Sequence, residues 1–227
     1  MKLCYQVATP DVAVADSVTA YQGPLDQSFG DLARLGYDGV ELMTLNPGEL
    51  DWEEVKGTAE KYGISIALVC TGELFGQLGL SYTSPEEEIR REAIKRTKEI
   101  IDFAGYLGAN INIGRVRGQY CARLSHEQTE GLAVEAFREL ADYAAPGNVA
   151  IALETVTIMQ TNFINTLAEG ARMVERVDRP NSVSYTHLDR GRHARYRKPC
   201  RRCPAFAPYL QIQSHHGDHH AGRPLLF

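Results

Sequence analysis

The sequence predicts an α/β protein of the (β/α)8 barrel type, in which parallel strands alternate with helices. Five apolar strand segments begin near residues 2, 39, 64, 109 and 149, and a helix-forming segment follows each of them. This order implies parallel strands joined by right-handed crossovers, either in an open doubly wound sheet or in a closed barrel. The chain contains neither a GxGxxG nor a GxxxxGKS/T phosphate loop, which favours the barrel.

The length of the chain limits how much of a barrel it can form. A complete barrel of eight units occupies about 250 residues. The five predicted units already take up 178 of the 227 residues, so about 49 remain for three more. We therefore expect a barrel that is truncated after about five βα units and followed by an irregular C-terminal tail.

The strands are short apolar runs, and start and stop signals mark the helices. Pro24 can open the first helix, and Gly36 can end it. Ser84, Pro85 and the glutamates after them indicate a helix start. Capping-box pairs open three other helices: Asp51 with Glu54, Ser125 with Gln128, and Thr166 with Glu169. The predicted strands are residues 2–7, 39–43, 64–70, 109–114 and 149–154.

Charge divides the chain into two parts. The formal net charge is −5, but residues 182–227 carry +6 and residues 1–181 carry −11. Six of the seven histidines also lie in the basic part. We interpret residues 1–181 as a partial barrel and residues 182–227 as a basic, His-rich, non-homologous segment that arises from truncation or a frame artefact.

Several classes of protein are disfavoured by composition. No run of about 18 apolar residues is present, and the N-terminus lacks the pattern of a signal peptide, so we expect no membrane partner. Five cysteines without framework spacing indicate reduced thiols and a cytoplasmic location. The acidic body, with no histidine at its five strand ends, gives no sign of specific nucleic-acid binding.

The carboxyl ends of parallel strands are where a site is expected. Glu154 ends an otherwise apolar strand, where a carboxylate can meet a divalent cation or move a proton. The alternative is a solvated strand-end carboxylate without function. Glu41 follows the same logic on a weaker strand, where a structural salt bridge is at least as good an interpretation.

Other polar residues at the strand ends are candidates for substrate binding. Arg115 and Arg117 lie in the glycine-flanked segment GRVRG and can hold an anionic or polyhydroxy substrate, or can simply be exposed. Cys70 is more typical of a packed thiol than of a nucleophile. Asn112 is a further polar residue at a strand end, in the predicted strand that follows the one containing Cys70.

Three segments, in this order along residues 1–181, resemble the sugar phosphate isomerase/epimerase family. They are GYDGVELM, then CTGELFGQLGLSYTSPEEEIRREAIKRTKEIIDFAGYLGANINIGRVRG, then VAIALETVTIMQTNFINTLAEGARMVERVDRPN. This family comprises xylose-isomerase-like TIM barrels and includes ketose 3-epimerases and hydroxypyruvate isomerases. The resemblance implies one divalent cation (Mn²⁺, Mg²⁺ or Co²⁺) and proton transfer through an enediolate. It makes Glu154 both a metal ligand and the catalytic acid/base.

The chain departs from the family pattern at two places. The substrate-orienting glutamate of many relatives corresponds to Gln160, which can hydrogen-bond but is not a base. Relatives continue to an Asp-x-x-His segment, a His and a Glu that complete the metal site, whereas Thr186-His187-Leu188-Asp189 does not match that order.

Two hypotheses about function follow. One is a metal-dependent isomerase or epimerase of a sugar, a sugar phosphate or a small keto acid. The other is a catalytically inactive barrel fragment that lacks three metal ligands, binds its cation poorly and self-associates through its open edge.

Overall fold

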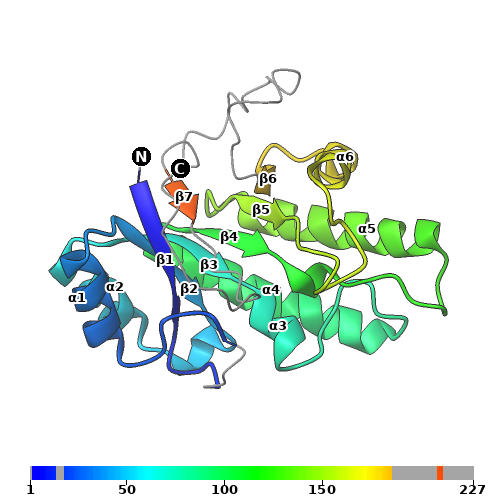
Figure 1. Cartoon of the computed structure of the whole chain (residues 1–227). Coiled ribbons are helices and arrows are strands. Elements are labelled where there is room, and N and C mark those ends of the chain that lie inside the picture. Colours follow the sequence, from blue (N-terminus) through cyan, green and yellow to red (C-terminus); the bar gives the residue numbers. More distant parts are fainter. Residues whose placement is uncertain (1, 14–17, 186–208, 212–227) are drawn as a thin grey trace, which may run out of the picture.

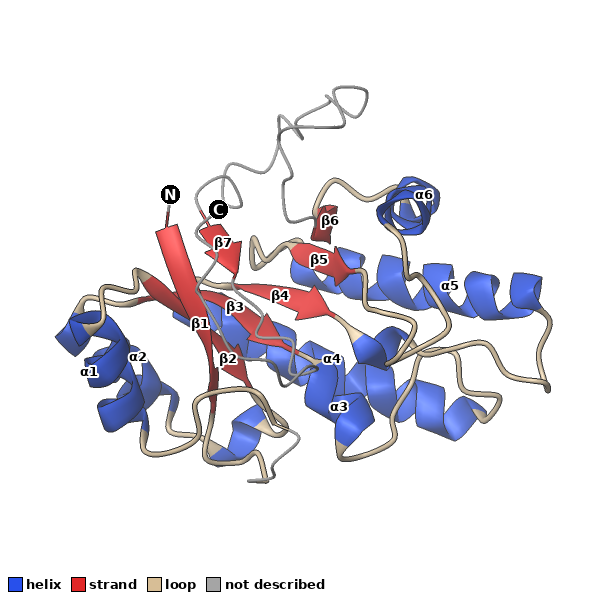
Figure 2. Cartoon of the chain, in the orientation of Figure 1, coloured by secondary structure: helices blue, strands red, loops and turns tan. Residues whose placement is uncertain are grey.

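Parallel strand pairing organises the whole molecule. The computed structural model describes residues 2–13, 18–185 and 209–211. Its strands form one parallel sheet in the order β6-β5-β4-β3-β2-β1-β7, and the helices run alongside it (Figures 1 and 2). The predicted α/β barrel-type fold is confirmed, with the five expected strands in barrel order.

The elements alternate along the chain. The strands are β1 (Lys2–Ala8), β2 (Gly39–Met43), β3 (Ser65–Cys70), β4 (Asn110–Ile113), β5 (Ile151–Glu154), β6 (Ser182–Tyr185) and β7 (Tyr209–Gln211). The α-helices are α1 (Leu25–Arg34), α2 (Trp52–Tyr62), α3 (Gly72–Gly76), α4 (Glu87–Leu107), α5 (His126–Ala144) and α6 (Leu167–Val177). Two short 3₁₀ turns are η1 (Pro47–Glu49) and η2 (Arg115–Arg117).

The two faces of the sheet differ in polarity because successive strand side chains point to opposite sides. The side chains on the helix-covered face are apolar and fully buried in one core cluster, among them Val40, Leu42, Ile111, Ile151 and Leu153. The inner face carries polar side chains at the alternate positions, namely Gln6, Glu41, Asn112 and Glu154. This separation places the polar groups together, away from the helices.

Local signals explain most helix boundaries. Ser125 and Thr166 each form the reciprocal capping box expected of them, and Asp51 accepts a hydrogen bond from the backbone N–H of Glu54. Helix α4 begins at Glu87, later than predicted. The Ser84 hydroxyl accepts a hydrogen bond from the backbone N–H of Glu86 at 3.2 Å, and this bond forms a turn before the helix. The segment after β3, expected as a loop, contains the short helix α3.

The sheet continues past the change in composition at residue 181. Strand β6 pairs with β5 from Ile151 opposite Ser182 to Glu154 opposite Tyr185, and β7 pairs with β1. The sequence predicts no strand there. Strand β6 lacks the usual apolar signal because Ser182 and Ser184 alternate in it, and their hydroxyls are buried without a hydrogen-bond partner among the described residues. The division into residues 1–181 and 182–227 stays a prediction.

None of the helices in the described part of the chain is long and apolar enough to cross a membrane. The cysteines described there, Cys4, Cys70 and Cys121, are free thiols.

The capping box of α5 gives a test of the fold. We expect Ser125→Ala to lower the free energy of unfolding by about 1 kcal/mol, because the backbone N–H of Gln128 at the helix start loses its acceptor, the Ser125 hydroxyl. Urea unfolding followed by circular dichroism measures this. Ser125→Asp, which keeps an acceptor, is expected to stay close to wild type, and equal losses in both variants would contradict the assignment.

Candidate active site

A hydrogen-bond network joins the inner face of β2, β3 and β4. Glu41 lies in the middle of β2 and is 1% exposed. Its Oε1 accepts hydrogen bonds from the Cys70 thiol at 2.8 Å and from the Asn112 side-chain amide at 3.0 Å. Gln6 on β1 in turn donates to the Cys70 sulfur at 3.7 Å. The strand-end residues that the sequence nominated on β2, β3 and β4 are therefore in contact.

Asn112 links this network to Glu154. Its side-chain Nδ2 donates to Glu154 Oε2 at 3.2 Å, so one amide group serves two carboxyl groups on strands β2 and β5. The same Glu154 oxygen lies against the backbone of Gly114, where a Cβ would come within 2.8 Å of it. The glycine permits this close approach. Glu154 is partly exposed, and its carboxylate accepts the hydrogen bond from Asn112 and lies close to the backbone of Gly114.

Burial changes the protonation of the inner groups. Desolvation raises the pKa of Glu41 to about 8; the negative charge of Glu154 adds to this, and the hydrogen bond from Cys70 opposes it. Desolvation, followed by the neighbouring Glu41, raises the pKa of Cys70 well above its usual range. Cys70 is therefore a thiol that donates a hydrogen bond and not a nucleophilic thiolate. Glu41 is largely neutral at pH 7.

Two buried oxygens on this face have no hydrogen-bond partner among the described residues. They are Glu41 Oε2 and Asn112 Oδ1. Such groups normally meet water or a ligand, because an unpartnered buried acceptor is costly.

The described residues do not by themselves fit a divalent cation. In residues 2–13, 18–185 and 209–211, no three or more Asp, Glu, His or Cys side chains gather around a common point. Glu41 is buried and largely neutral, which leaves Glu154 as the accessible carboxylate of the network. Manganese and magnesium ordinarily take six ligands.

Arg115 lies at the edge of the network. Its guanidinium donates to Glu73 Oε1 at 3.1 Å and approaches the carbonyl of Gly72 at 3.4 Å, and its side chain is 33% exposed. Glu73 itself is buried on α3. This pair ties the segment after β3 to the segment after β4 and leaves Arg115 partly open to solvent.

Arg117 has a different environment, although it lies only two residues further on. It is 0% exposed, and its guanidinium donates to the carbonyls of Gly114, Phe163 and Ile164. Burial lowers its pKa to about 10, against the raising effect of the negative charges of Glu154 and Glu169, so it stays protonated at neutral pH. The structure makes it an internal brace of the rim.

Gln160 is not brought into the network. It lies exposed in a turn after β5, where its backbone N–H donates to the carbonyl of Thr157 at 2.9 Å. Its role as a substrate contact stays a prediction.

Sequence reasoning missed Gln6 and Asp11. The Asp11 carboxylate accepts hydrogen bonds from the Thr44 hydroxyl at 2.8 Å and from the backbone N–H groups of Leu45 and Asn46, so it ties the segment after β1 to the segment after β2. The Thr9-Pro10-Asp11 sequence directly after a strand is the signal that could have indicated such a turn.

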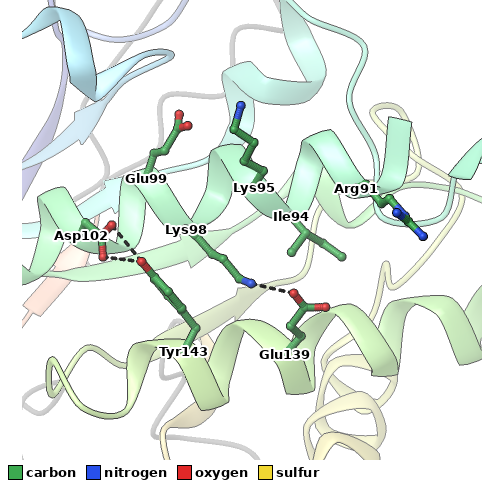
Figure 3. Close-up of a pocket in the computed structure, with 8 residues that line it drawn as sticks. All are labelled: Arg91, Ile94, Lys95, Lys98, Glu99, Asp102, Glu139 and Tyr143. Carbon is green, nitrogen blue, oxygen red and sulfur yellow. Dashed lines mark hydrogen bonds and ion pairs between the residues drawn. The ribbon is translucent and has the colours of Figure 1, made fainter. Parts of the chain in front are cut away.

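A groove on the outer surface does not belong to this site. It lies between α4 and α5, measures about 450 Å³ and is bordered by the ion pair of Lys98 with Glu139 and the hydrogen bond of Tyr143 with Asp102 (Figure 3). It lies on the helical layer, whereas the Glu41–Glu154 network lies on the inner face of the sheet.

Comparison with known proteins decides the family. The profile of the xylose isomerase-like TIM barrel family matches residues 29–186. The chain belongs to this family. Within the xylose isomerase-like TIM barrels, it is 31% identical over 170 residues to the L-ribulose 3-epimerase of Methylomonas sp. (strain DH-1), covering 72% of this chain and 56% of that protein. The resemblance drawn from the sequence is confirmed.

Solved structures of xylose isomerase-like proteins share the fold of this chain. A D-allulose 3-epimerase from Methylomonas sp. superposes with a TM-score of 0.59 at 26% identity, over 70% of this chain and 55% of that one, and has also been solved in complex with D-allulose. The fold is also shared with 3-keto-D-glucoside 4-epimerase from E. coli, with a TM-score of 0.64 at 20% identity, over 81% and 67% of the two chains. The chain spans about half the length of the curated relatives it matches.

The raised pKa of Glu41 has a measurable consequence. The folded protein keeps a proton on Glu41 that the unfolded chain loses between pH 4.5 and about 8. The free energy of unfolding therefore falls as pH rises through this window, by up to about 1.4 kcal/mol per pH unit. We expect Glu41→Gln to remove this slope, which urea unfolding at pH 5 to 9 would show. Glu175→Gln, on the exposed face of α6, is the control, and parallel curves for wild type and Glu41→Gln would refute the assignment.

Proposed function

We propose that the rim around Glu154 is the proton-transfer part of a sugar isomerase or epimerase site, with a ketose as the preferred substrate class. The observation that carries this proposal is the Glu154 carboxylate itself. It ends an apolar strand, is partly exposed, and is fixed by Asn112 and the Gly114 backbone. Membership of the xylose isomerase-like family and the similarity to ketose 3-epimerases support it.

In this proposal, Glu154 accepts the proton from a carbon next to the substrate carbonyl, and the product is an enediolate. Returning the proton to the same carbon from the opposite side gives an epimer, and moving it to the neighbouring carbon gives an isomer. A carboxylate within hydrogen-bond reach suits this task. The amide of Asn112 keeps Glu154 oriented, since its second hydrogen bond goes to a fixed, buried partner, Glu41.

Substrate contacts are proposed at the mouth of the site. Arg115 is the partly exposed arginine there and suits hydroxyl or carboxylate oxygens. Gln160 lies outside the hydrogen-bond network, and we propose it as a further substrate contact. Because a similar epimerase has been solved with D-allulose bound, we favour a ketohexose or ketopentose over hydroxypyruvate. Among the other nominated residues, Cys70 and Glu41 shape the inner wall, and Arg117 braces it.

We propose that Glu154 contributes one ligand to a divalent cation, Mn²⁺, Mg²⁺ or Co²⁺, and that this chain binds the cation poorly. Within residues 2–13, 18–185 and 209–211, the one accessible carboxylate of the network does not supply the ligand set that such ions require.

A second candidate is a catalytically inactive chain that at most binds ligands. It is favoured by the ligand set of the described residues, which holds no group of three metal-binding side chains. Self-association through the strand edges, a cytoplasmic location and the absence of nucleic-acid or membrane partners stay predictions.

Hydrogen exchange into the substrate separates the two candidates. We expect the 227-residue chain with Mn²⁺ to exchange the hydrogen beside the carbonyl of D-allulose or L-ribulose with D₂O slowly, and to give no detectable net epimerisation. The reason is that the described residues supply one accessible carboxylate, Glu154, where the proposed reaction needs two opposed acid/base groups. Losing groups that act as a unit can cost on the order of a million-fold in rate. Proton NMR of the sugar measures both quantities.

Matched variants give this experiment its controls. Glu154→Gln is expected to abolish the exchange, whereas Glu175→Gln is expected to leave it unchanged. Exchange that is equal in wild type and Glu154→Gln would overturn the proposed function. Exchange or net turnover that Glu154→Gln abolishes would exclude the inactive candidate.

Cation binding provides an independent prediction. We expect Mn²⁺ titrations, followed by electron paramagnetic resonance, to show weak binding that Glu154→Gln reduces further and Glu175→Gln does not, since a carboxylate contributes an anionic oxygen ligand. Affinity that is unchanged in Glu154→Gln would remove this residue from the cation site.

A further inference from the structure

Arg117 connects two separate segments of the rim. It lies in η2, directly after β4, and reaches across to the segment between β5 and α6. Its Nη1 donates to the carbonyl of Gly114 at 2.7 Å. Its Nη2 donates to the carbonyls of Phe163 and Ile164 at 2.7 and 2.9 Å, and its Nε donates to Phe163 at 3.1 Å. One fully buried guanidinium therefore holds three backbone carbonyls.

The far end of this brace is a strained backbone. Ile164 has a φ of 59°, and β-branched residues rarely adopt this left-handed conformation. The strain persists because neighbours over-determine the segment. Besides Arg117, the Asn165 side chain donates to the carbonyls of Val156 and Thr161, and the Thr161 hydroxyl donates to the carbonyl of Gly118.

The near end of the brace is the surface on which Glu154 lies. The carbonyl of Gly114 is held by Arg117, and the α-carbon of the same residue faces Glu154 Oε2 so closely that a Cβ would lie 2.8 Å from it. A movement of Gly114 toward Glu154 would therefore press on the carboxylate.

We propose that Arg117 is a positioning residue for Glu154, acting through Gly114 and not by touching the substrate. The catalytic meaning of this role rests on the proposed function; the positioning itself does not. The planar fork of an arginine spreads five N–H donors and reaches carbonyls on two segments at once, whereas a lysine ammonium carries three donors on a single nitrogen. Lysine keeps the positive charge but loses the brace, so the two contributions can be separated.

The test reads the Glu154 carboxyl group directly. In the full chain labelled with ¹³C at the glutamate carboxyl carbon, Glu154→Gln identifies the signal of Glu154. We expect Arg117→Met and Arg117→Lys both to shift or split this signal. Arg138→Met is the matched control, because Arg138 also donates to backbone carbonyls, those of Arg176 and Val177, at the end of α6. It should destabilise the protein without changing the Glu154 signal.

The outcomes are distinct. An unchanged signal in Arg117→Lys with a shift in Arg117→Met would show that only charge matters and would overturn the proposal, as would no change in either variant. An equal shift in Arg138→Met would show that the shift comes from general destabilisation, which would also overturn the proposal. The signal is readable whether or not a sugar is turned over, so failure here differs from failure of the proposed function.

A second variant covers the case in which Arg117 variants do not fold. Gly114→Ala keeps the Arg117 side chain and places a Cβ directly against the Glu154 carboxylate. We expect the same carboxyl signal to shift in this variant, with wild-type circular dichroism. An unshifted signal in folded Gly114→Ala would disprove the contact through which Arg117 is proposed to act.

Discussion

The hydrogen bonds of the Asn112 amide are the interaction on which the inner face depends. They reach Glu41 on one side and Glu154 on the other, and so connect strands that lie far apart in the sequence. Two carboxyl groups facing the same interior repel each other when both are charged. The structure resolves this by burying Glu41 until it holds its proton, while Glu154 sits at the partly exposed strand end. The position of each residue on its strand thus sets its chemical state.

The parallel sheet makes this arrangement possible. Alternation along each strand sends Leu42, Ile111 and Leu153 into the core beneath the helices and sends their neighbours Glu41, Asn112 and Glu154 to the opposite face. A register shift between Val40 and Glu41, where β2 pairs with β3, also aligns Leu68 and Cys70 with the inner face. Cys70 then acts as a donor to Glu41, a role that desolvation enforces by keeping its thiol protonated.

Much of this could be predicted from sequence, and the remainder could not for physical reasons. The strand–helix period and the capping pairs Ser125–Gln128 and Thr166–Glu169 are local signals. The order of the elements and the starts of these two helices could therefore be predicted from the sequence. The gathering of Glu41, Cys70 and Glu154 followed from parallel strand ends. Whether a residue is buried depends on packing between distant segments, and no local pattern reports it. Arg115 and Arg117 show this, because they belong to one motif and differ in burial. Arg115 is partly exposed and pairs with Glu73, whereas Arg117 is fully buried.

The buried cation at Arg117 explains how the rim tolerates an unfavourable backbone. Placing a guanidinium out of water is costly unless its N–H groups find acceptors, and each of its three nitrogens donates to a carbonyl after β4 or β5. One of these carbonyls belongs to Ile164, whose left-handed backbone conformation costs of order 1–3 kcal/mol. The hydrogen bonds from Arg117 to the carbonyls of Phe163 and Ile164 thus join the buried cation to the segment with the unfavourable backbone. The nearby negative charges of Glu154 and Glu169 favour the protonated guanidinium further, so the Glu154 carboxylate, which is proposed to act on a substrate, also stabilises the buried arginine. Stability and positioning at this rim are therefore coupled through one side chain.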